Sequence, residues 1–272
     1  MRLTPGGETR LVGLIGDPVA HSLSPLMQNA AFAALALDWA YVPLRVGREN
    51  LEQAVAGLVA LGFAGANVTI PHKTAVASFC DELDEVAARA GSVNTLVVRD
   101  GKVHGSSTDG LAVTDLVDAA GARVLVLGAG GGAQAVATAL GDAGASAIAV
   151  AARDPERAHA LALRLRSLFP DLDVAAEESW PPSSAEATLV VNATPVRDEA
   201  LVRPAPEHQV VDLAYRTDGE PTALVAAARE AGCTGVVDGL AVLLGQGAAS
   251  FERWTGLEAP VAVMGAALSP SR

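Results

Sequence analysis

The sequence is poor in cysteine, in aromatic residues and in positive charge. Of its 272 residues only 2 are cysteines and 4% are aromatic, and 19 lysines and arginines stand against 31 aspartates and glutamates, for a formal net charge of −12. Cys80 and Cys233 are far apart and have no metal-ligand spacing, so we expect free thiols in a reducing compartment. The negative charge argues against nucleic acid and anionic membranes as partners.

Long hydrophobic runs are also missing. No run approaches the ~20 apolar residues of a membrane span, and the N-terminal stretch has no apolar core of a signal peptide. We therefore expect a cytoplasmic protein without a membrane partner. Half of the residues are hydrophobic and 18% are charged, which favours a compact protein of one large or two modest domains and excludes disorder.

The chain does have a glycine-rich turn between an apolar run at 123–127 and an alanine-rich helical pattern. This order predicts a buried parallel strand, a tight turn at Gly128 and a helix that packs closely through Ala133. Gly130 would let a phosphate approach the backbone, and the N terminus of the helix would offer N–H groups to it. A glycine-rich connection in another α/β domain is the alternative, but the strand and helix favour dinucleotide binding.

The residues after the next expected strand, 146–151, indicate which dinucleotide binds. An NAD site would place a carboxylate there to hold the ribose hydroxyls, whereas this chain has Ala152 and Arg153. Arg153 and Arg157, four residues apart, would lie on one face at the start of a helix and suit a 2′-phosphate. Two exposed arginines paired with neighbouring acids are the alternative. Asp154 is a carboxylate that could serve NAD, so NAD stays an alternative cofactor, and we favour NADP.

The first part of the chain alternates between expected strands and helices. We expect strands at 10–16, 39–43, 64–69 and 90–99, and helices at 26–37 and 51–61. This alternation predicts a mostly parallel sheet. Ser24 is the expected N-cap and Pro25 the first residue of the first helix. Asp100-Gly101 predicts a hairpin turn.

Polar residues gather around the end of the third strand. Asn67 and Thr69 would share one strand face, and Pro71 would begin a helix with Lys73 in its first turn. A solvated surface lysine is the alternative, but the nearby Asn67 and Thr69 favour function. Asp109 is either the N-cap of a helix expected over 111–120 or a functional carboxylate.

The second part of the chain predicts another alternating domain and a long apolar helix. Its strands are expected at 123–127, 146–151, 171–175, 188–192, 209–213 and 235–237, with helices between them, notably 155–168 and 222–231, and a loop at 177–185. The apolar helix is expected over 240–256 and contains Gln246. A buried glutamine needs partners, so a structural hydrogen bond is the alternative to a binding role.

Taken together, these motifs resemble the shikimate dehydrogenase family over essentially the whole chain and in the family's order. The similar segments are 22–25, 67–73, 92–95, 108–110, 128–133, Arg153 with Arg157, 192–195, 212–215 and 246–256. The chain departs from the family pattern at Ser107 and Ala152, where asparagine is usual, at 196–198, and after Tyr215. None of these departures removes a residue that must move a proton.

The resemblance implies two α/β domains separated by a cleft: a substrate domain at 1–108 plus 241–272, and a Rossmann-like NADP-binding domain at 109–240. It implies reversible NADPH-dependent reduction of 3-dehydroshikimate to shikimate in aromatic amino acid (chorismate) biosynthesis. Lys73 would exchange the proton, and Asp109 would orient Lys73 and balance its charge. The implied substrate-binding residues are Ser22, Ser24, Asn67, Thr69, Asn94, Tyr215 and Gln246. The implied NADP(H)-binding residues are Gly128, Ala129, Gly130, Gly131, Gly132, Ala133, Arg153, Arg157, Thr194 and Gly239.

Three other functions remain compatible with the sequence. They are a quinate/shikimate dehydrogenase that uses NAD, a non-catalytic NADP-binding regulatory module, and a related two-domain dehydrogenase for a different cyclic substrate. No metal is expected, because none of the histidines has ligand spacing. We expect a small-molecule substrate as the partner and a monomer or homodimer as the assembly.

Overall fold

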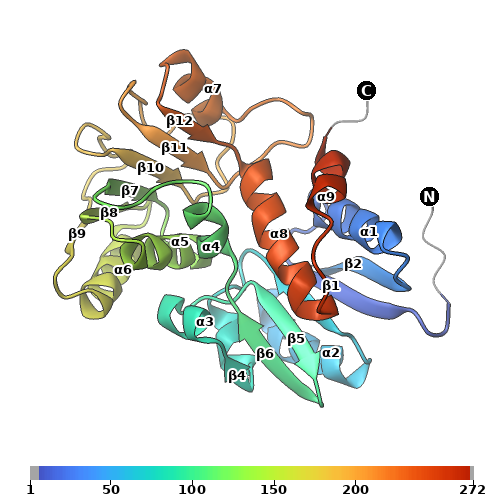
Figure 1. The fold of residues 1–272 in the computed structure, drawn as a ribbon. Helices are drawn as coiled ribbons and strands as arrows, with labels where there is room; N and C mark the ends of the chain where they lie inside the picture. Colours follow the sequence, from blue (N-terminus) through green and yellow to red (C-terminus); the bar gives the residue numbers. More distant parts are fainter. Residues whose placement is uncertain (1–5, 270–272) are drawn as a thin grey trace. The chain divides into compact units, whose positions relative to one another are not determined.

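The computed structural model describes residues 6–269, which form two compact α/β units (Figure 1). Unit 1 comprises 6–108 and 244–269, and unit 2 is Asp109–Leu243. Each unit has its own six-stranded sheet. Helix α8, Gly239–Thr255, contains the second division between the units. Among residues 6–269, no helix has the length and apolar character needed to cross a membrane.

Unit 1 is built on a mixed sheet with the strand order β2-β1-β3-β5-β6-β4. Its strands are β1 (Arg10–Gly16), β2 (Trp39–Arg45), β3 (Gly65–Val68), β4 (Glu82–Leu83), β5 (Thr95–Arg99) and β6 (Lys102–Ser106). Its helical elements are α1 (Ser24–Ala34), η1 (Arg48–Asn50), α2 (Leu51–Ala60), η2 (Ala75–Phe79), α3 (Glu85–Ala90) and α9 (Val261–Leu268), with the C-terminal part of α8.

The pairing in this sheet changes direction after β3. Strand β1 pairs in parallel with β2 and β3, as the alternating pattern predicts, whereas β3–β5 and β5–β6 are antiparallel. The hairpin at Asp100 and Gly101 is confirmed, and both residues have positive φ (53° and 75°). A two-residue turn of this type reverses the chain, so β6 must run antiparallel to β5.

Helix α1 begins one residue earlier and ends earlier than expected. Ser24 is the first helical residue rather than the N-cap, which is Leu23, and the Ser22 hydroxyl accepts a hydrogen bond from the Ser24 N–H (3.2 Å). The N–H of Leu37 donates to the Phe32 carbonyl (2.9 Å), a bond that closes the helix and turns the chain toward β2.

Pro71 does not begin an α-helix, so this expectation is wrong. The residues after it form a turn that leads into the 3₁₀ helix η2. The Lys73 carbonyl accepts from the Val93 N–H (2.8 Å), and His72 Nε2–H donates to the Val46 carbonyl (2.7 Å). Because these tertiary bonds hold the backbone out of a helical path, Lys73 lies in a turn and not in the first turn of a helix.

Unit 2 is a parallel doubly wound sheet with the order β12-β11-β10-β7-β8-β9. Its strands are β7 (Arg123–Leu127), β8 (Ala147–Ala151), β9 (Asp173–Ala176), β10 (Leu189–Asn192), β11 (Gln209–Asp212) and β12 (Gly235–Val237). Its helices are α4 (Asp109–Thr114), α5 (Gly131–Asp142), α6 (Pro155–Leu168), α7 (Ala223–Glu230) and the start of α8. The strand order reverses between β7 and β10, as in Rossmann folds.

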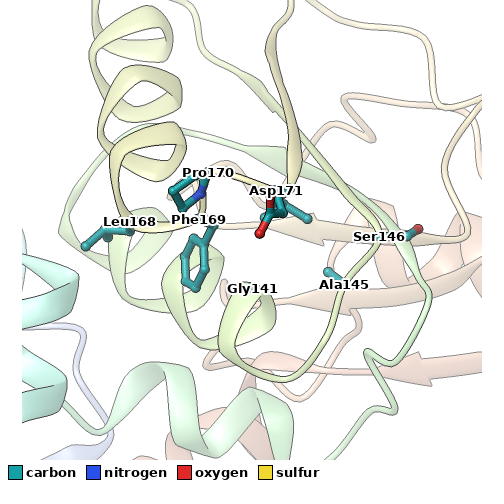
Figure 2. A pocket seen from close by; sticks show the side chains of 8 residues that line it. Gly141, Ala145, Ser146, Leu168, Phe169, Pro170 and Asp171 are labelled. Carbon is teal, nitrogen blue, oxygen red and sulfur yellow. The ribbon is translucent and has the colours of Figure 1, made fainter.

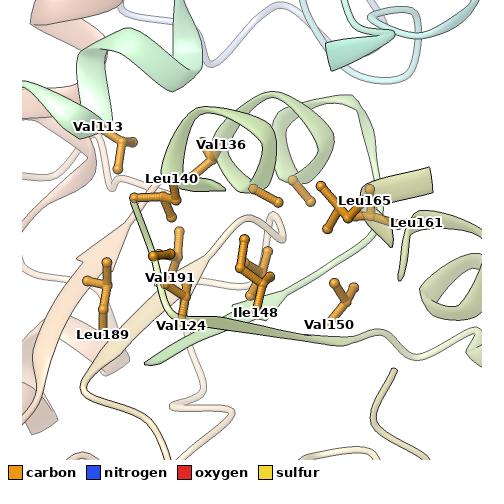
Figure 3. Close-up of a cluster of buried hydrophobic side chains, with 14 of the residues drawn as sticks. Val113, Val124, Val136, Leu140, Ile148, Val150, Leu161, Leu165, Leu189 and Val191 are labelled. Atoms are coloured by element: carbon orange, nitrogen blue, oxygen red, sulfur yellow. The ribbon is translucent and has the colours of Figure 1, made fainter. Parts of the chain in front are cut away.

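Small and branched apolar residues fill the space between this sheet and its helices. Figure 3 shows Val124 and Ile148 of the sheet and Val136 and Leu140 of α5, and all four are buried in one core cluster. Ala133 is also buried there, and its small side chain lets α5 approach the strands, as the sequence predicts. The Rossmann-like fold follows from this packing.

The bounds of β7, α6 and β12 are those expected from the sequence, but other elements differ. Helix α4 ends at Thr114, short of the expected 120, and 177–188 and 193–208 contain no helix. The strand expected at 90–99 begins only at Thr95. Helices α3 and α9 were not expected. Helix α9 is apolar throughout and so gives no helical periodicity, although Met264 anchors it in the core.

Candidate active site

The glycine turn of unit 2 lies at the carboxyl edge of the sheet, where the strand order reverses. Leu127, the last residue of β7, stands beside Asn192, the last residue of β10. Gly128 follows with a φ of 110°, and a Cβ on it would lie 3.1 Å from the Ala193 carbonyl oxygen. Both the backbone angle and the space therefore require glycine at this position.

The N terminus of α5 carries no side chain that could occupy its N–H groups. Its N-cap is Gly130, and glycine residues follow at Gly131 and Gly132. A Cβ on Gly130 would approach only Arg157 Nη2, at 3.9 Å, and a Cβ on Gly132 only Leu213 Cδ2, at 3.7 Å. Space, bare backbone donors and the positive end of the helix dipole together fit the pyrophosphate of a dinucleotide. Ala129, between the two turn glycines, is buried.

The two arginines expected to hold a 2′-phosphate take different positions. Arg157 lies in the first turn of α6, and its Nη2 donates to the Ala129 carbonyl in the glycine turn (3.4 Å). Arg153 precedes α6 and is exposed, so the expectation that the pair shares one helix face is wrong. Asp154 is the N-cap, and its carboxylate accepts from the Glu156 N–H (3.1 Å). This structural bond is the reason that α6 begins after Arg153.

Two polar residues at the ends of β10 and β11 form a buried cluster in unit 2. Asn192 Nδ2 donates to Asp212 Oδ1 (2.8 Å), and Thr222 Oγ1 donates to Asp212 Oδ2 (2.5 Å). Burial raises the pKa of Asp212 to about 6, against the opposing effect of the hydrogen bonds from Thr222, Ala214 and Asn192. Thr194 is held in the same cluster, because its hydroxyl donates to Asn192 Oδ1 (2.7 Å).

The two loops that depart from the family pattern in unit 2 bind each other. Arg216, next to Tyr215, pairs with Asp198 of the other loop and with Asp218 (2.6 Å). The hydrogen bond from Arg216 lowers the pKa of Asp218 to about 2. The departures at 196–198 and after Tyr215 are therefore coupled, since an acid in one loop meets a base in the other. Tyr215 itself is half-buried.

Gly239 lies against the backbone just before Tyr215. A Cβ on Gly239 would collide with the Ala214 carbonyl oxygen and would lie 3.0 Å from the Leu213 carbonyl oxygen. The start of α8 can approach the end of β11 only because this residue has no side chain.

In unit 1, segments far apart in the sequence meet in a buried polar cluster. Asn94 Nδ2 donates to Thr108 Oγ1 (2.8 Å) and to Gln246 Oε1 (3.3 Å), and Asn94 Oδ1 accepts from the Thr108 N–H (2.9 Å). The Thr108 hydroxyl donates to the Gln246 carbonyl (3.1 Å). The structure thus brings Asn94 and Gln246 together, and Thr108 holds both.

Asn67 belongs to the same cluster but faces the protein interior, with 4% of its surface exposed. Its Oδ1 accepts from the Tyr41 hydroxyl (2.9 Å), and its Nδ2 lies within 3.2 Å of the Asn94 carbonyl, Thr95 Oγ1 and Ser250 Oγ. The protein therefore uses both hydrogens of this amide.

The remaining expected residues of unit 1 follow β1 and β3 in the chain: Ser22, Thr69 and Lys73 lie on loops, and Ser24 is the first residue of α1. Ser24 is buried, whereas Ser22, Thr69 and Lys73 are half-buried. Thr69 is outside β3, which ends at Val68, and its N–H donates to the Ile15 carbonyl (2.8 Å). A Cβ on Gly16 would collide with Thr69 Cγ2, so this glycine makes room for the threonine.

Asp109 is the first residue of α4, and 5% of its surface is exposed. It directly follows Thr108 in the chain. Helix α4 therefore begins two residues before the helix expected over 111–120. Helix α4 packs tightly on α5, since a Cβ on Gly110 would lie 2.6 Å from the Ala135 carbonyl oxygen.

A surface pocket of 410 Å³ lies elsewhere in unit 2 (Figure 2). It is lined by Gly141, Ala145, Ser146, Leu168, Phe169, Pro170, Asp171 and Leu172. These residues surround the C-terminal end of α5 and the start of β8, the end opposite to the glycine turn. Asp171 is its one ionisable side chain, so it lacks the converging polar groups of a binding site. Across residues 6–269, no three His, Cys, Asp or Glu side chains gather closely enough to hold a metal ion.

Some residues of the polar clusters were not identified from the sequence. Tyr41, Thr95, Thr108 and Ser250 supply hydroxyls to the unit 1 cluster. Ser250 lies four residues after Gln246, a spacing that places both on one helix face and could have indicated its role. Tyr41 and Thr95 lie within strands, where no local pattern distinguishes them from core residues.

Comparison with known proteins decides the family. Residues 14–96 match the model of the shikimate dehydrogenase substrate binding domain, 110–214 that of shikimate/quinate 5-dehydrogenase, and 239–268 that of the shikimate 5′-dehydrogenase C-terminal domain. The shikimate dehydrogenase (NADP(+)) of Rubrobacter xylanophilus is 46% identical, over 97% of this chain and 96% of the relative. The chain belongs to the shikimate dehydrogenase family.

Solved structures of this fold extend the comparison. A crystal structure of a shikimate dehydrogenase in complex with NADP+ has a TM-score of 0.87 and 33% identity, with coverage of 97% of this chain and 96% of that one. A ligand-free 5-ketofructose reductase of Gluconobacter sp. strain CHM43 has a TM-score of 0.84 and 30% identity. The match covers 97% of this chain and 99% of that one. Enzymes with this fold are therefore named for different substrates. The substrate of this protein has to be inferred from its site residues.

Proposed function

We propose that this member of the family is an NADP-dependent shikimate dehydrogenase, which reversibly reduces 3-dehydroshikimate to shikimate in aromatic amino acid biosynthesis. The observation that carries the proposal is the buried cluster of Asn94, Thr108 and Gln246 in unit 1. Amides and hydroxyls fixed in this way suit a ring with several hydroxyl groups, and they reject analogues that lack those groups. Relatives of matching length carry the same activity in their names.

Lys73 is proposed as the acid/base group and Asp109 as the carboxylate that balances its charge. Lys73 would give a proton to the oxygen that becomes the shikimate hydroxyl, and would take it back in the reverse reaction. Ser22, Ser24, Thr69, Asn94, Tyr215 and Gln246 are proposed to bind the carboxylate and hydroxyls of the substrate. Asn67 is proposed to belong to the same site.

The glycine turn and its arginine are proposed to hold NADP(H). When bound, the cofactor would supply the hydride. The backbone N–H groups of Gly131, Gly132 and Ala133 would bind the pyrophosphate, and Ala129 and Gly130 would leave room for it. Arg157, already at the glycine turn, would bind the 2′-phosphate together with Arg153. Thr194 and Gly239 would shape the nicotinamide side of the site.

The cellular setting follows from the same proposal. We propose a cytoplasmic enzyme that acts on a small molecule as a monomer or homodimer. Cys80 and Cys233 are both free thiols, as is usual in a reducing compartment. Burial raises the pKa of Cys80 to about 11, so this thiol is unreactive at neutral pH.

Nicotinamide absorbance with purified protein tests the proposal. Shikimate and quinate are each paired with NADP+ and NAD+, and we expect turnover with shikimate and NADP+ to exceed every other pair by more than about tenfold. Equal or better turnover with quinate and NAD+ would favour the quinate-type enzyme. Tight NADP+ binding without turnover of any pair would instead indicate a regulatory module.

Replacement of Lys73 tests its proposed role. In Lys73→Ala we expect kcat to fall by about 10²- to 10⁴-fold, the usual loss when an acid/base group is removed, with a melting temperature close to wild type. Lys102→Ala is the matched control, because Lys102 lies on the exposed β5–β6 hairpin and pairs only with Glu82 (3.4 Å) among the described contacts. If Lys73→Ala retained full kcat, the proton would come from another group.

A further inference from the structure

A chain of buried hydrogen bonds joins β2, β3 and β5 to α8 in unit 1. The Tyr41 hydroxyl donates to Asn67 Oδ1 (2.9 Å), and Asn67 Nδ2 donates to Ser250 Oγ (3.0 Å). The Ser250 hydroxyl in turn donates to the Gln246 carbonyl (2.9 Å) and lies 2.8 Å from Thr95 Oγ1. All five residues are buried.

This chain ends at the residues proposed to bind substrate. Asn67 Nδ2 also donates to the Asn94 carbonyl (3.0 Å), so one amide supports the backbone of Asn94 and the side chain of Ser250. The Gln246 carbonyl accepts from two hydroxyls, those of Ser250 and Thr108. The turn of α8 that carries Gln246 is therefore tied to β3 through Ser250 and to the end of β6 through Thr108.

We infer that Asn67, Ser250 and Tyr41 are positioning residues, which hold the amides of Asn94 and Gln246 in place for the substrate. Asn67 acts through its neighbours, because its own donors are already used within the protein. The inference rests on the proposed function, in which Asn94 and Gln246 contact shikimate. It assigns substrate affinity to side chains that need not touch the substrate at all.

Loss of the Ser250 hydroxyl would disturb both ends of this chain. The Asn67 donor would lose its acceptor on α8, and the Gln246 carbonyl would lose one of its two hydroxyl donors. A buried donor without a partner raises the free energy of the folded state, and we expect the neighbouring groups to move so that the donor finds another acceptor. We expect such a shift to reach the Gln246 carbonyl directly and the Asn94 carbonyl through Asn67, and to leave the glycine turn of unit 2 unchanged.

Kinetics of Ser250→Ala test the inference. We expect KM for shikimate to rise about 5- to 10-fold, the effect of one lost hydrogen bond, with KM for NADP+ and kcat within about twofold of wild type. Tyr41→Phe should raise the same KM. Because both residues act through Asn67, the double variant should raise KM by less than the product of the two single effects.

Two control variants separate positioning from loss of stability. Thr255→Ala removes a hydroxyl that makes the same bond to the carbonyl four residues earlier on α8 (2.9 Å to Phe251). Its other described hydrogen bond is accepted from the Leu257 N–H (3.1 Å), outside the polar cluster. Val55→Ala makes a cavity in the core beside α2 and lowers the melting temperature. Both should retain the wild-type KM for shikimate. If they raise it as much as Ser250→Ala, the positioning role is overturned.

A second readout is independent of activity. The exchange rates of the side-chain amide hydrogens of Asn94 and Gln246, followed by NMR, should rise more than about tenfold in Ser250→Ala and remain unchanged in Thr255→Ala. Unchanged exchange in Ser250→Ala would overturn the inference. A wild-type protein that does not oxidise shikimate, yet shows the faster exchange in Ser250→Ala, would refute the proposed function and leave the coupling of these residues in place.

Discussion

At the scale of single residues, Asp212 illustrates how burial controls a charged group. It has no exposed surface and accepts hydrogen bonds from Asn192, Thr222 and the Ala214 N–H. Burial disfavours the charged carboxylate more strongly than these three bonds favour it, so the pKa rises to about 6. The folded protein therefore binds a proton at Asp212 at a pH where the unfolded chain has released it.

The raised pKa of Asp212 makes the folded protein more stable at low pH than at high pH. Protonated Asp212 stabilises the fold fully below the unfolded pKa of 3.8, and the contribution is lost as the pH rises through about 6. Between pH 5 and pH 7 the free energy of unfolding of the wild type should fall by about 1 kcal/mol relative to that of Asp212→Asn, because asparagine mimics the protonated form. Hydrogen exchange of peptides covering β10 and β11, compared between the two proteins at each pH, measures this loss. A difference independent of pH would contradict the raised pKa.

At the scale of elements, the turn between β7 and α5 contains two glycines with different tasks. Gly128 has a positive φ of 110° and lies against the backbone of Ala193, whereas Gly130 has a φ of −87° and open space around it. The first glycine is required by the fold. The fold places no such requirement on the second, and we expect it to serve a ligand that approaches the backbone.

Alanine at each position should separate these two tasks. Gly128→Ala should destabilise the protein by about 1–3 kcal/mol, because the backbone angle and the Ala193 carbonyl both oppose a side chain. Gly130→Ala should lower the free energy of unfolding by less than about 1 kcal/mol. The same variant should raise KM for NADP+ by about tenfold or more. Thermal melting and steady-state kinetics of the two variants provide the comparison. An unchanged KM in Gly130→Ala would show that the cofactor does not approach this residue.

At the scale of the whole molecule, we expect each ligand to stabilise mainly the unit that supplies most of its proposed binding residues. The glycine turn and Arg157 belong to unit 2, whereas Lys73, Asn94 and Gln246 belong to unit 1. A ligand that binds the folded form stabilises it by about 2.7 kcal/mol at 100 times its Kd. The stabilisation appears first in the elements that hold the ligand.

Hydrogen exchange of the full chain, with each ligand alone, tests this division. NADP+ at 100 times its Kd should slow exchange by about 100-fold in peptides of β7 and α5 that exchange by unfolding of unit 2. Shikimate should protect β3, β5 and the C-terminal part of α8 instead. If shikimate alone protected β7 as strongly as β3, the proposed division of the binding residues would be wrong.

Local patterns in the sequence determined much of the fold. The apolar run at 123–127, the glycines after it and the helix that Pro155 begins have local causes, and the structure confirms their bounds. The family and its two-domain α/β architecture also follow from the order of motifs along the chain. The roles of the individual site residues stay predictions.

The tertiary structure decided what local patterns could not. Pro71 is a good first residue for a helix, yet the bonds of Lys73 and His72 to the distant Val93 and Val46 prevent that helix. Asn67 meets Tyr41 and Ser250 only because β2, β3 and α8 pack together. Periodicity, turn residues and motif order act over a few residues and are legible in the sequence. Hydrogen bonds between segments that are separated along the chain, such as those from Asn67 to Tyr41 and to Ser250, depend on packing, and only the folded chain reveals them.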